Sequence, residues 1–124
     1  MVLVLAVALG GGLGAVSRYG LDTFIERHAD SLFPWATFAI NVSGCLAVGF
    51  IIAALVDRHR APQWLRMGLV VGFCGGYTTF STFAQETLAT LEARDVVTTT
   101  AYVSASVGLG IVAVLIGTRL DRLV

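Results

Sequence analysis

Four long apolar blocks separated by short polar links constrain this chain more than any other feature. They extend over Val2–Val16 (with a weaker extension to Ile25), Phe33–Val56, Leu65–Leu91 and Val96–Thr118. A bilayer core needs roughly 20 apolar residues per helix, so the blocks predict four transmembrane helices. Only 13% of the residues are charged, whereas soluble domains average about 25%. We therefore expect one all-α membrane domain over residues 1–124, with no separate soluble domain.

The charge pattern bears on partners and orientation. The net charge is zero, which gives no basic surface for a nucleic acid. Four spans place both termini on one side of the membrane. That side would carry Arg58, Arg60, Arg66, Arg119 and Arg122, and the other side Arg18, Arg27 and Arg94. Orientation follows the basic residues in short loops, so the split slightly favours cytoplasmic termini and is small enough for both orientations to insert.

Small residues at four-residue spacing predict close helix contacts. Gly10 and Gly14 form one GxxxG pair, and Gly68, Gly72 and Gly76 form a double one in the third block. Such spacing lets helices approach closely in lipid. Four short helices enclose little space, so a transport function would require an oligomer, most often a two-fold dimer.

The third block contains the sequence GFCGGYTTFSTF at 72–83. A continuous helix from Gln63 to Leu91 would be roughly 43 Å long, which exceeds a hydrocarbon core of about 30 Å. Glycine is costly inside a helix, so Gly72, Gly75 and Gly76 are the expected site of a break. A break would free carbonyls for a cation around Gly75–Thr78. A glycine-lined contact on an unbroken helix is the alternative that the residues leave equally open.

Polar side chains at membrane depth suggest an ion pathway. Thr79, Thr82 and Glu86 share one helical face, with Ser81 nearby, and Phe80 and Phe83 lie three residues apart. Ring edges are electropositive, so these groups could line a path for a small anion. Taken alone, however, two phenylalanines at this spacing more often face lipid or pack in a core. Further candidates are Asn41 in the second block, Thr98, Tyr102 and Ser106 in the fourth, and Arg18 at the end of the first. Asn41 could donate to a passing anion or form an interhelical hydrogen bond.

Three stretches together carry a resemblance to a known family. GGLGAVSRYG at 11–20, NVSG at 41–44 and GFCGGYTTFSTF at 72–83 resemble, in this order and over the whole chain, the CrcB/Fluc family of fluoride channels. The resemblance implies an antiparallel, dual-topology homodimer in a prokaryotic plasma membrane, embedded in lipid. It implies passive, uncoupled export of cytoplasmic fluoride through two pores, and no enzyme activity.

The resemblance also implies roles for particular residues. A structural sodium ion at the dimer centre would be held by the backbone carbonyls of Gly75 and Thr78 and would not be transported. Phe80 and Phe83 match the pore phenylalanines, and Glu86 lies at the far end of the polar track. The polar pore residues would be Asn41, Ser81, Thr82 and Tyr102. One turn beyond Ser106 a further hydroxyl is expected, where this chain has Gly110.

Two other classes of protein share parts of this pattern. A small multidrug exporter has a similar length, four spans and a dimeric state, but it needs an acidic residue inside the first span. Val2–Val16 contains none, and the first acidic residue is Asp22. A structural membrane subunit would explain the GxxxG pairs but not Asn41 or the hydroxyl groups.

Overall fold

In the computed structural model, residues 1–57 and 61–120 are described, and this part of the chain is helical with short connections. The long helices are α1 (Val2–Glu26), α2 (Trp35–Ile51) and α6 (Val96–Leu120). A π-helical segment, η1 (Ile52–Asp57), extends α2. Arg58, Arg60 and Arg122, which entered the orientation argument, lie outside the described residues.

Three helical stretches are long and apolar enough to cross a membrane: Val2–Glu26, Trp35–Leu55 and Val96–Leu120. They correspond to the first, second and fourth predicted blocks. Their outward side chains are apolar and exposed, as at Leu9, Leu13 and Val16 on α1, which are 65–71% exposed. By contrast, the largest fully buried side chains include the polar-tipped Tyr102 and Thr37. An apolar exterior around a partly polar interior is typical of a protein whose solvent is lipid.

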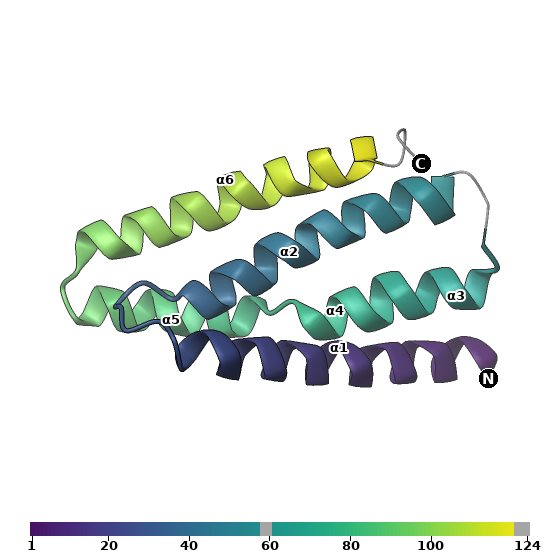
Figure 1. Ribbon diagram of the computed structural model, residues 1–124, viewed down its shortest axis with the longest axis horizontal. Coiled ribbons are helices and arrows are strands. Elements are labelled where there is room, and N and C mark those ends of the chain that lie inside the picture. The colour runs from purple at the N-terminus through teal and green to yellow at the C-terminus, as the bar shows by residue number, and fades with distance from the viewer. Residues whose placement is uncertain (58–60, 121–124) are drawn as a thin grey trace.

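The third block forms a discontinuous helix. Three segments follow one another without a gap: α3 (Gln63–Met67), the π-helical η2 (Gly68–Cys74) and α4 (Gly75–Tyr77). Thr78 and Thr79 are extended, and α5 (Phe80–Glu92) then begins. In Figure 1 the two halves lie nearly in line, and the first half packs against α1. The start of α1 and the end of α6 lie at the same end of the bundle (Figure 1).

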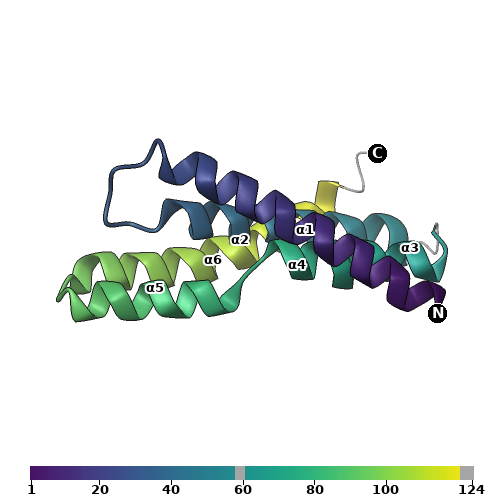
Figure 2. The same cartoon turned by 90° about the horizontal axis from the view of Figure 1, so that it is seen from below.

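The predicted glycine contact lies between α1 and the first half of this discontinuous helix. In Figure 2, α1 crosses directly over α4. A Cβ on Gly10 would clash with the carbonyl oxygen of Gly68, and one on Gly76 would clash with that of Gly11. A Cβ on Gly72 would lie 2.8 Å from the Val7 carbonyl oxygen. The GxxxG prediction is thus confirmed as a place where two backbones touch.

A second glycine contact joins α2 to α6 and was not predicted. A Cβ on Gly49 would clash with the carbonyl of Val114, and one on Gly117 with that of Leu46. These glycines lie far apart in sequence and each lacks a GxxxG partner on its own helix. Sequence spacing on one helix therefore gave no signal for this contact.

The position of the break corrects the sequence analysis. Gly72, Gly75 and Gly76 are all helical, and among the described residues no glycine has a positive φ. The chain leaves the helix at the two threonines after them, where Thr78 has φ −80° and ψ 158° and Thr79 has φ −148° and ψ 118°. The glycines serve the contact with α1, and the threonines form the break.

Candidate functional site: the helix break and the groove beside it

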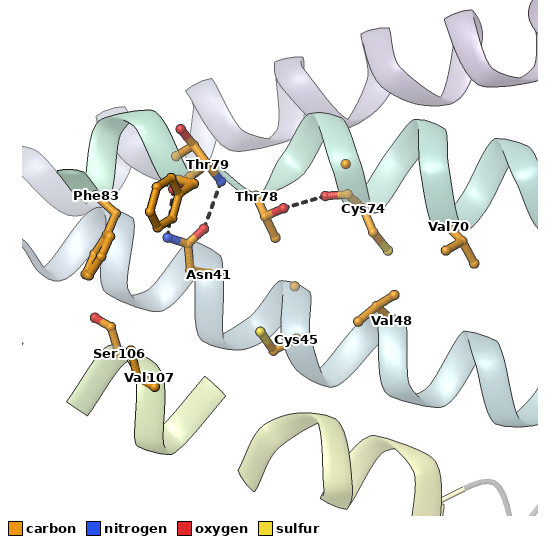
Figure 3. A pocket seen from close by; sticks show the side chains of 13 residues that line it. Asn41, Cys45, Val48, Val70, Cys74, Thr78, Thr79, Phe83, Ser106 and Val107 are labelled. Carbon is orange, nitrogen blue, oxygen red and sulfur yellow. Dashed lines mark hydrogen bonds between the residues drawn. The ribbon is translucent and has the colours of Figure 1, made fainter. Parts of the chain in front are cut away.

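The break is held open by one side chain from α2. The Asn41 amide donates from Nδ2 to the Thr79 carbonyl oxygen at 3.0 Å, and its Oδ1 accepts from the Thr79 backbone N–H at 2.8 Å. Figure 3 shows Asn41 reaching up from α2 to the extended residues. A buried backbone group without a partner costs about as much as a lost hydrogen bond. Asn41 therefore stabilises the break by satisfying both polar groups of Thr79. The sequence analysis left two roles open for Asn41, and this bond is the interhelical hydrogen bond that was one of them.

Thr79 also begins the second half of the helix. Its Oγ1 accepts from the backbone N–H of Thr82 at 3.2 Å and donates to the Thr82 hydroxyl at 3.0 Å. The Ser81 hydroxyl lies 3.3 Å away. Threonine is a favoured N-cap because its hydroxyl satisfies an amide that has no helical partner. Ser81 and Thr82 were predicted to line an anion path, but the bonds here join them to this cap.

The carbonyls that precede the break, from Gly75 to Thr78, lose their usual helical partners. In a continuous helix the Thr79 N–H would bond to the Gly75 carbonyl, and the Thr82 N–H to the Thr78 carbonyl. Here the first N–H bonds to Asn41 and the second to the Thr79 side chain. The carbonyls of Gly75 and Thr78 are thus two of those near the break whose i+4 donors bond to a side chain instead. These are the two residues assigned to the cation.

A groove of about 450 Å³ opens beside the break between α2, the discontinuous helix and α6. Four of the predicted pathway residues line it, together with both predicted cation ligands: Asn41, Phe80, Phe83, Ser106, Gly75 and Thr78. Figure 3 shows Ser106 on α6 facing the Phe83 ring. The Ser106 hydroxyl oxygen is buried and has no hydrogen-bond partner among the described residues. The groove therefore brings together unused hydrogen-bonding capacity and the two phenylalanines.

The two phenylalanine rings lie against each other but in different surroundings. Their centroids are 5.8 Å apart with an interplanar angle of 41°. Phe80 is 80% exposed, whereas Phe83 is partly covered and packs on Tyr102 at 5.1 Å. The described chain thus fixes Phe83 on one side and leaves Phe80 projecting outward.

Glu86, one turn beyond Phe83, accepts two hydroxyl hydrogen bonds. Thr37 on α2 donates to its Oε1 at 2.8 Å, and Tyr102 on α6 donates to its Oε2 at 2.6 Å. Thr37 and Tyr102 are 1% and 0% exposed. The carboxylate therefore ties three segments together at one end of the groove. Thr37 was missed by the sequence analysis, although a hydroxyl four residues before Asn41 on a helix shares its face.

Five predicted pathway residues do not line the groove: Ser81, Thr82, Glu86, Tyr102 and Arg18. Tyr102 contributes its ring to the packing around Phe83 and its hydroxyl to Glu86, and it does not line the groove. Arg18 is half-exposed on α1, and no residue of α1 is among those that line the groove. Gly110 is buried on α6, and the space that a Cβ would take there lies 3.5 Å from the Cys45 sulfur.

Known proteins resemble this chain over nearly its whole length. The family described as CrcB-like protein, Camphor Resistance (CrcB), matches residues 5–118. A protein of Flavobacterium psychrophilum named Fluoride-specific ion channel FluC is 39% identical over 113 residues, 91% of each chain. One of the same name from Solibacter usitatus is 44% identical over 118 residues, 95% of this chain and 97% of its own. Fluoride-specific ion channel FluC 1 of Nitrobacter hamburgensis is 41% identical over 119 residues, which are 96% of this chain and 94% of its own.

These matches favour one of the classes considered from the sequence. The small multidrug exporter and the structural subunit were the alternatives, and relatives at about 40% identity over more than nine tenths of the chain carry neither description. With a family match that reaches into every helix and leaves out only a few residues at each end, this chain belongs to the CrcB family.

Proposed function

We propose that this chain is a fluoride-selective channel that exports cytoplasmic fluoride passively across a prokaryotic plasma membrane. The observation that carries the proposal is the Asn41-held break beside a groove lined by Phe80, Phe83 and Ser106, in a chain whose relatives are named fluoride-specific ion channels. No ion gradient is coupled to transport in this scheme. The gradient of fluoride itself supplies the driving force.

The groove offers the groups that a small, strongly hydrated anion needs. The Asn41 amide uses one N–H on Thr79, and an amide nitrogen carries two, so the second remains for an ion. The Ser106 hydroxyl is a further donor without a partner. Ring edges of Phe80 and Phe83 add positive potential without adding a charge. Together these groups replace part of the hydration shell of fluoride. Glu86, with its two hydroxyl donors Thr37 and Tyr102, continues the row of polar groups towards one membrane face.

We assign four membrane crossings to each chain, the third made by the discontinuous helix. Residues 63–77 and 80–92 would each extend only about 20 Å, which is shorter than a hydrocarbon core of about 30 Å. The two halves lie in line (Figure 1) and cross it jointly. Non-helical backbone is tolerated at membrane depth where protein or a water-filled cavity surrounds it.

The functional unit is a homodimer of antiparallel chains. The groove is open on the surface of one chain, and lipid tails cannot satisfy the second N–H of the Asn41 amide or the Ser106 hydroxyl, which has no partner among the described residues. The Ser43 and Tyr77 hydroxyls, bonded to each other at 2.8 Å, add a further exposed polar pair between α2 and α4. A second copy that covers the groove would remove them from lipid and would bring its own projecting Phe80 to the first chain. The near-even arginine split allows both orientations to insert.

A structural sodium ion fits the break. The residues that would hold it are Gly75 and Thr78, whose carbonyl oxygens have lost their i+4 donors to Asn41 and Thr79. Backbone oxygens at an unwound helix are typical ligands for sodium in membrane proteins. A Cβ on Gly75 would meet no atom within 4 Å, so there is room in front of this residue for an ion and a second chain. When bound, the ion supplies positive charge that joins the two breaks.

Efflux from liposomes tests the channel assignment. Purified protein in potassium fluoride vesicles should release fluoride when valinomycin shunts potassium, and should release little chloride under the same conditions. A folded dimer that releases no fluoride would refute the assignment.

Two further measurements test the dimer and its ion. Labelling of a tagged terminus, in a background without Cys45 and Cys74, should find that terminus on both faces of the membrane. Labelling from one face alone would refute dual topology. Exchange of sodium for N-methylglucamine should lower dimer stability or flux, because an ion that binds only the assembled dimer stabilises it by mass action. Unchanged dimer stability and unchanged flux after complete exchange would argue against the ion.

A further inference from the structure

A chain of aromatic rings runs from the loop between α1 and α2 to the groove. The ring of Phe33 lies 4.4 Å from that of Trp35 and 5.4 Å from that of Tyr102, where the contact is edge-on at 80°. Tyr102 packs on Phe83 at 5.1 Å, and Phe83 packs on Phe80 at 5.8 Å. The loop is thus connected by direct ring contacts to the two phenylalanines of the proposed anion path.

Phe33 occupies a well-defined place in this loop. Its backbone N–H donates to the Ser31 hydroxyl at 3.0 Å, and its carbonyl accepts from the Trp35 N–H at 2.8 Å. It lines a hollow of about 300 Å³ at the end of the bundle, and Glu86 lines the same hollow. The ring therefore lies where the polar track reaches the membrane face.

Tyr102 is the residue through which Phe33 can act. It is fully buried, its hydroxyl is bonded to Glu86 at 2.6 Å, and one ring contact is to Phe83. Any movement of the Tyr102 ring would change the positions of both a carboxylate and a phenylalanine of the track. Phe33 is the ring that packs against Tyr102 from the loop.

We propose that Phe33 is a positioning residue of the anion path, which holds the Tyr102 ring and thereby sets the orientation of Phe83 and Glu86. This inference rests on the proposed function, since the path it positions is the fluoride path. Phe33 itself does not line the groove. Loss of its ring would leave Tyr102 free to tilt towards the loop.

Phe38 provides a matched control. Its ring contacts Phe33 at 5.6 Å and Trp35 at 5.9 Å. Among the ring pairs of the described residues it has none with Tyr102 or Phe83. Phe33→Leu and Phe38→Leu therefore remove similar apolar area from the same cluster, but only the first removes a contact with Tyr102.

Fluoride efflux gives the first readout. Phe33→Leu should lower the efflux rate by roughly three- to tenfold, the scale of one lost aromatic pair, while Phe38→Leu stays within about twofold and Phe33→Tyr, which keeps the ring, recovers the rate. Phe33→Leu combined with Phe83→Ile should lower the rate by less than the product of the two single effects, because part of the Phe33 effect acts through Phe83. Efflux near wild type for Phe33→Leu, or effects that multiply in the double variant, would overturn the proposal.

A spectroscopic readout separates this inference from the channel assignment. The chain has three tyrosines, so fluorotyrosine labelling gives three ¹⁹F signals, and Tyr102→Phe identifies that of Tyr102. Phe33→Leu should shift the Tyr102 signal and leave the other two in place, whereas Phe38→Leu should shift none. If Phe33→Leu fails to form a dimer, Phe33→Met serves instead. A wild type without efflux defeats the proposed function, whereas an unshifted Tyr102 signal defeats this inference alone.

Discussion

The two halves of the sequence GFCGGYTTFSTF differ in backbone structure: the first half is helical and packs against α1, whereas the second half begins with two extended residues. In the first half, Gly72 and Gly76 stay helical and bring the backbone against α1. In the second half, Thr78 and Thr79 leave the helix and are held by side chains instead. In the first half, the absence of glycine side chains lets two helix backbones touch. In the second half, the absence of helical hydrogen bonds leaves backbone carbonyls without their usual donors beside the groove.

The comparison shows what breaks a helix in this protein. The flexibility of glycine does not cause the break, because Gly72, Gly75 and Gly76 keep helical backbone angles. Asn41 and the Thr79 hydroxyl bond to the amides that would otherwise bond to Gly75 and Thr78, and so offer the backbone an alternative to the helix. The break is therefore a tertiary feature, fixed by a residue of α2 that lies 38 positions away in sequence.

The largest expected effect contrasts two adjacent glycines. Gly76→Ala places a Cβ against the Gly11 backbone, whereas Gly75→Ala places one in open space with helical φ and ψ. Because backbone cannot move aside as a side chain can, Gly76→Ala should cost at least about 1–3 kcal/mol and sharply lower the yield of dimer. Gly75→Ala should fold. Thermal melts and gel filtration of both variants check this. Equal loss in both would mean that Gly75 also lies at a crowded backbone contact, for example with the second chain.

Asn41 gives an effect of comparable size and tests the break itself. Asn41→Leu leaves the N–H and the carbonyl of Thr79 without partners, and each unsatisfied group costs about 1–3 kcal/mol. We expect marked destabilisation and loss of fluoride efflux. Asn41→Asp keeps the acceptor for the Thr79 N–H and should therefore retain more stability than Asn41→Leu. If Asn41→Leu is as stable as wild type, the break does not depend on this residue.

Much of the fold could be predicted because lipid imposes simple rules. Long apolar blocks gave the positions of α1, α2 and α6. The spacing of Gly10, Gly72 and Gly76 indicated that these segments make close helix contacts but did not say with which helix. The presence of a break was also open to prediction from length. Its position was not, because the competing hydrogen bonds come from Asn41, and a single sequence does not show which residue faces which.

The candidate site was predicted in its residue types more than in its geometry. Asn41, Phe80, Phe83 and Ser106 do meet in one groove. The hydroxyl of Tyr102, in contrast, is taken up by Glu86 together with that of Thr37. The bonds from Thr37 and Tyr102 to Glu86 depend on which face each helix turns towards its neighbours. Helices that are apolar on all faces do not reveal that orientation in their sequence. Whether these residues conduct an ion stays a prediction until flux is measured.

A smaller effect is expected at the N-cap of α5. Thr79→Val keeps the shape of the side chain but removes the hydroxyl that accepts from the Thr82 N–H, and should cost about 1 kcal/mol. Thr79→Ser keeps the hydroxyl and should remain near wild type. Thr78→Val is the neighbouring control, because the Thr78 hydroxyl bonds only to the Cys74 carbonyl, which also accepts the Thr78 N–H. Denaturation in detergent ranks the three. A larger loss for Thr78→Val than for Thr79→Val would contradict the cap.

The smallest effect concerns a second helix cap, at the aqueous end of the bundle. Asp95 accepts from the backbone N–H of Thr98 at 2.9 Å at the start of α6, and this bond lowers the pKa of its carboxyl below the usual value. A lowered folded-state pKa means that the extra stability is present above the unfolded-state pKa and is lost as the pH falls through the folded-state pKa. Wild type should therefore melt slightly higher than Asp95→Ala near neutral pH, and the difference should shrink between about pH 5 and pH 3. The Thr79 cap has no charge, so the difference between wild type and Thr79→Val should not change over that range. Melting curves of the three proteins across pH test both statements, and a difference between wild type and Thr79→Val that changes with pH would contradict an uncharged cap.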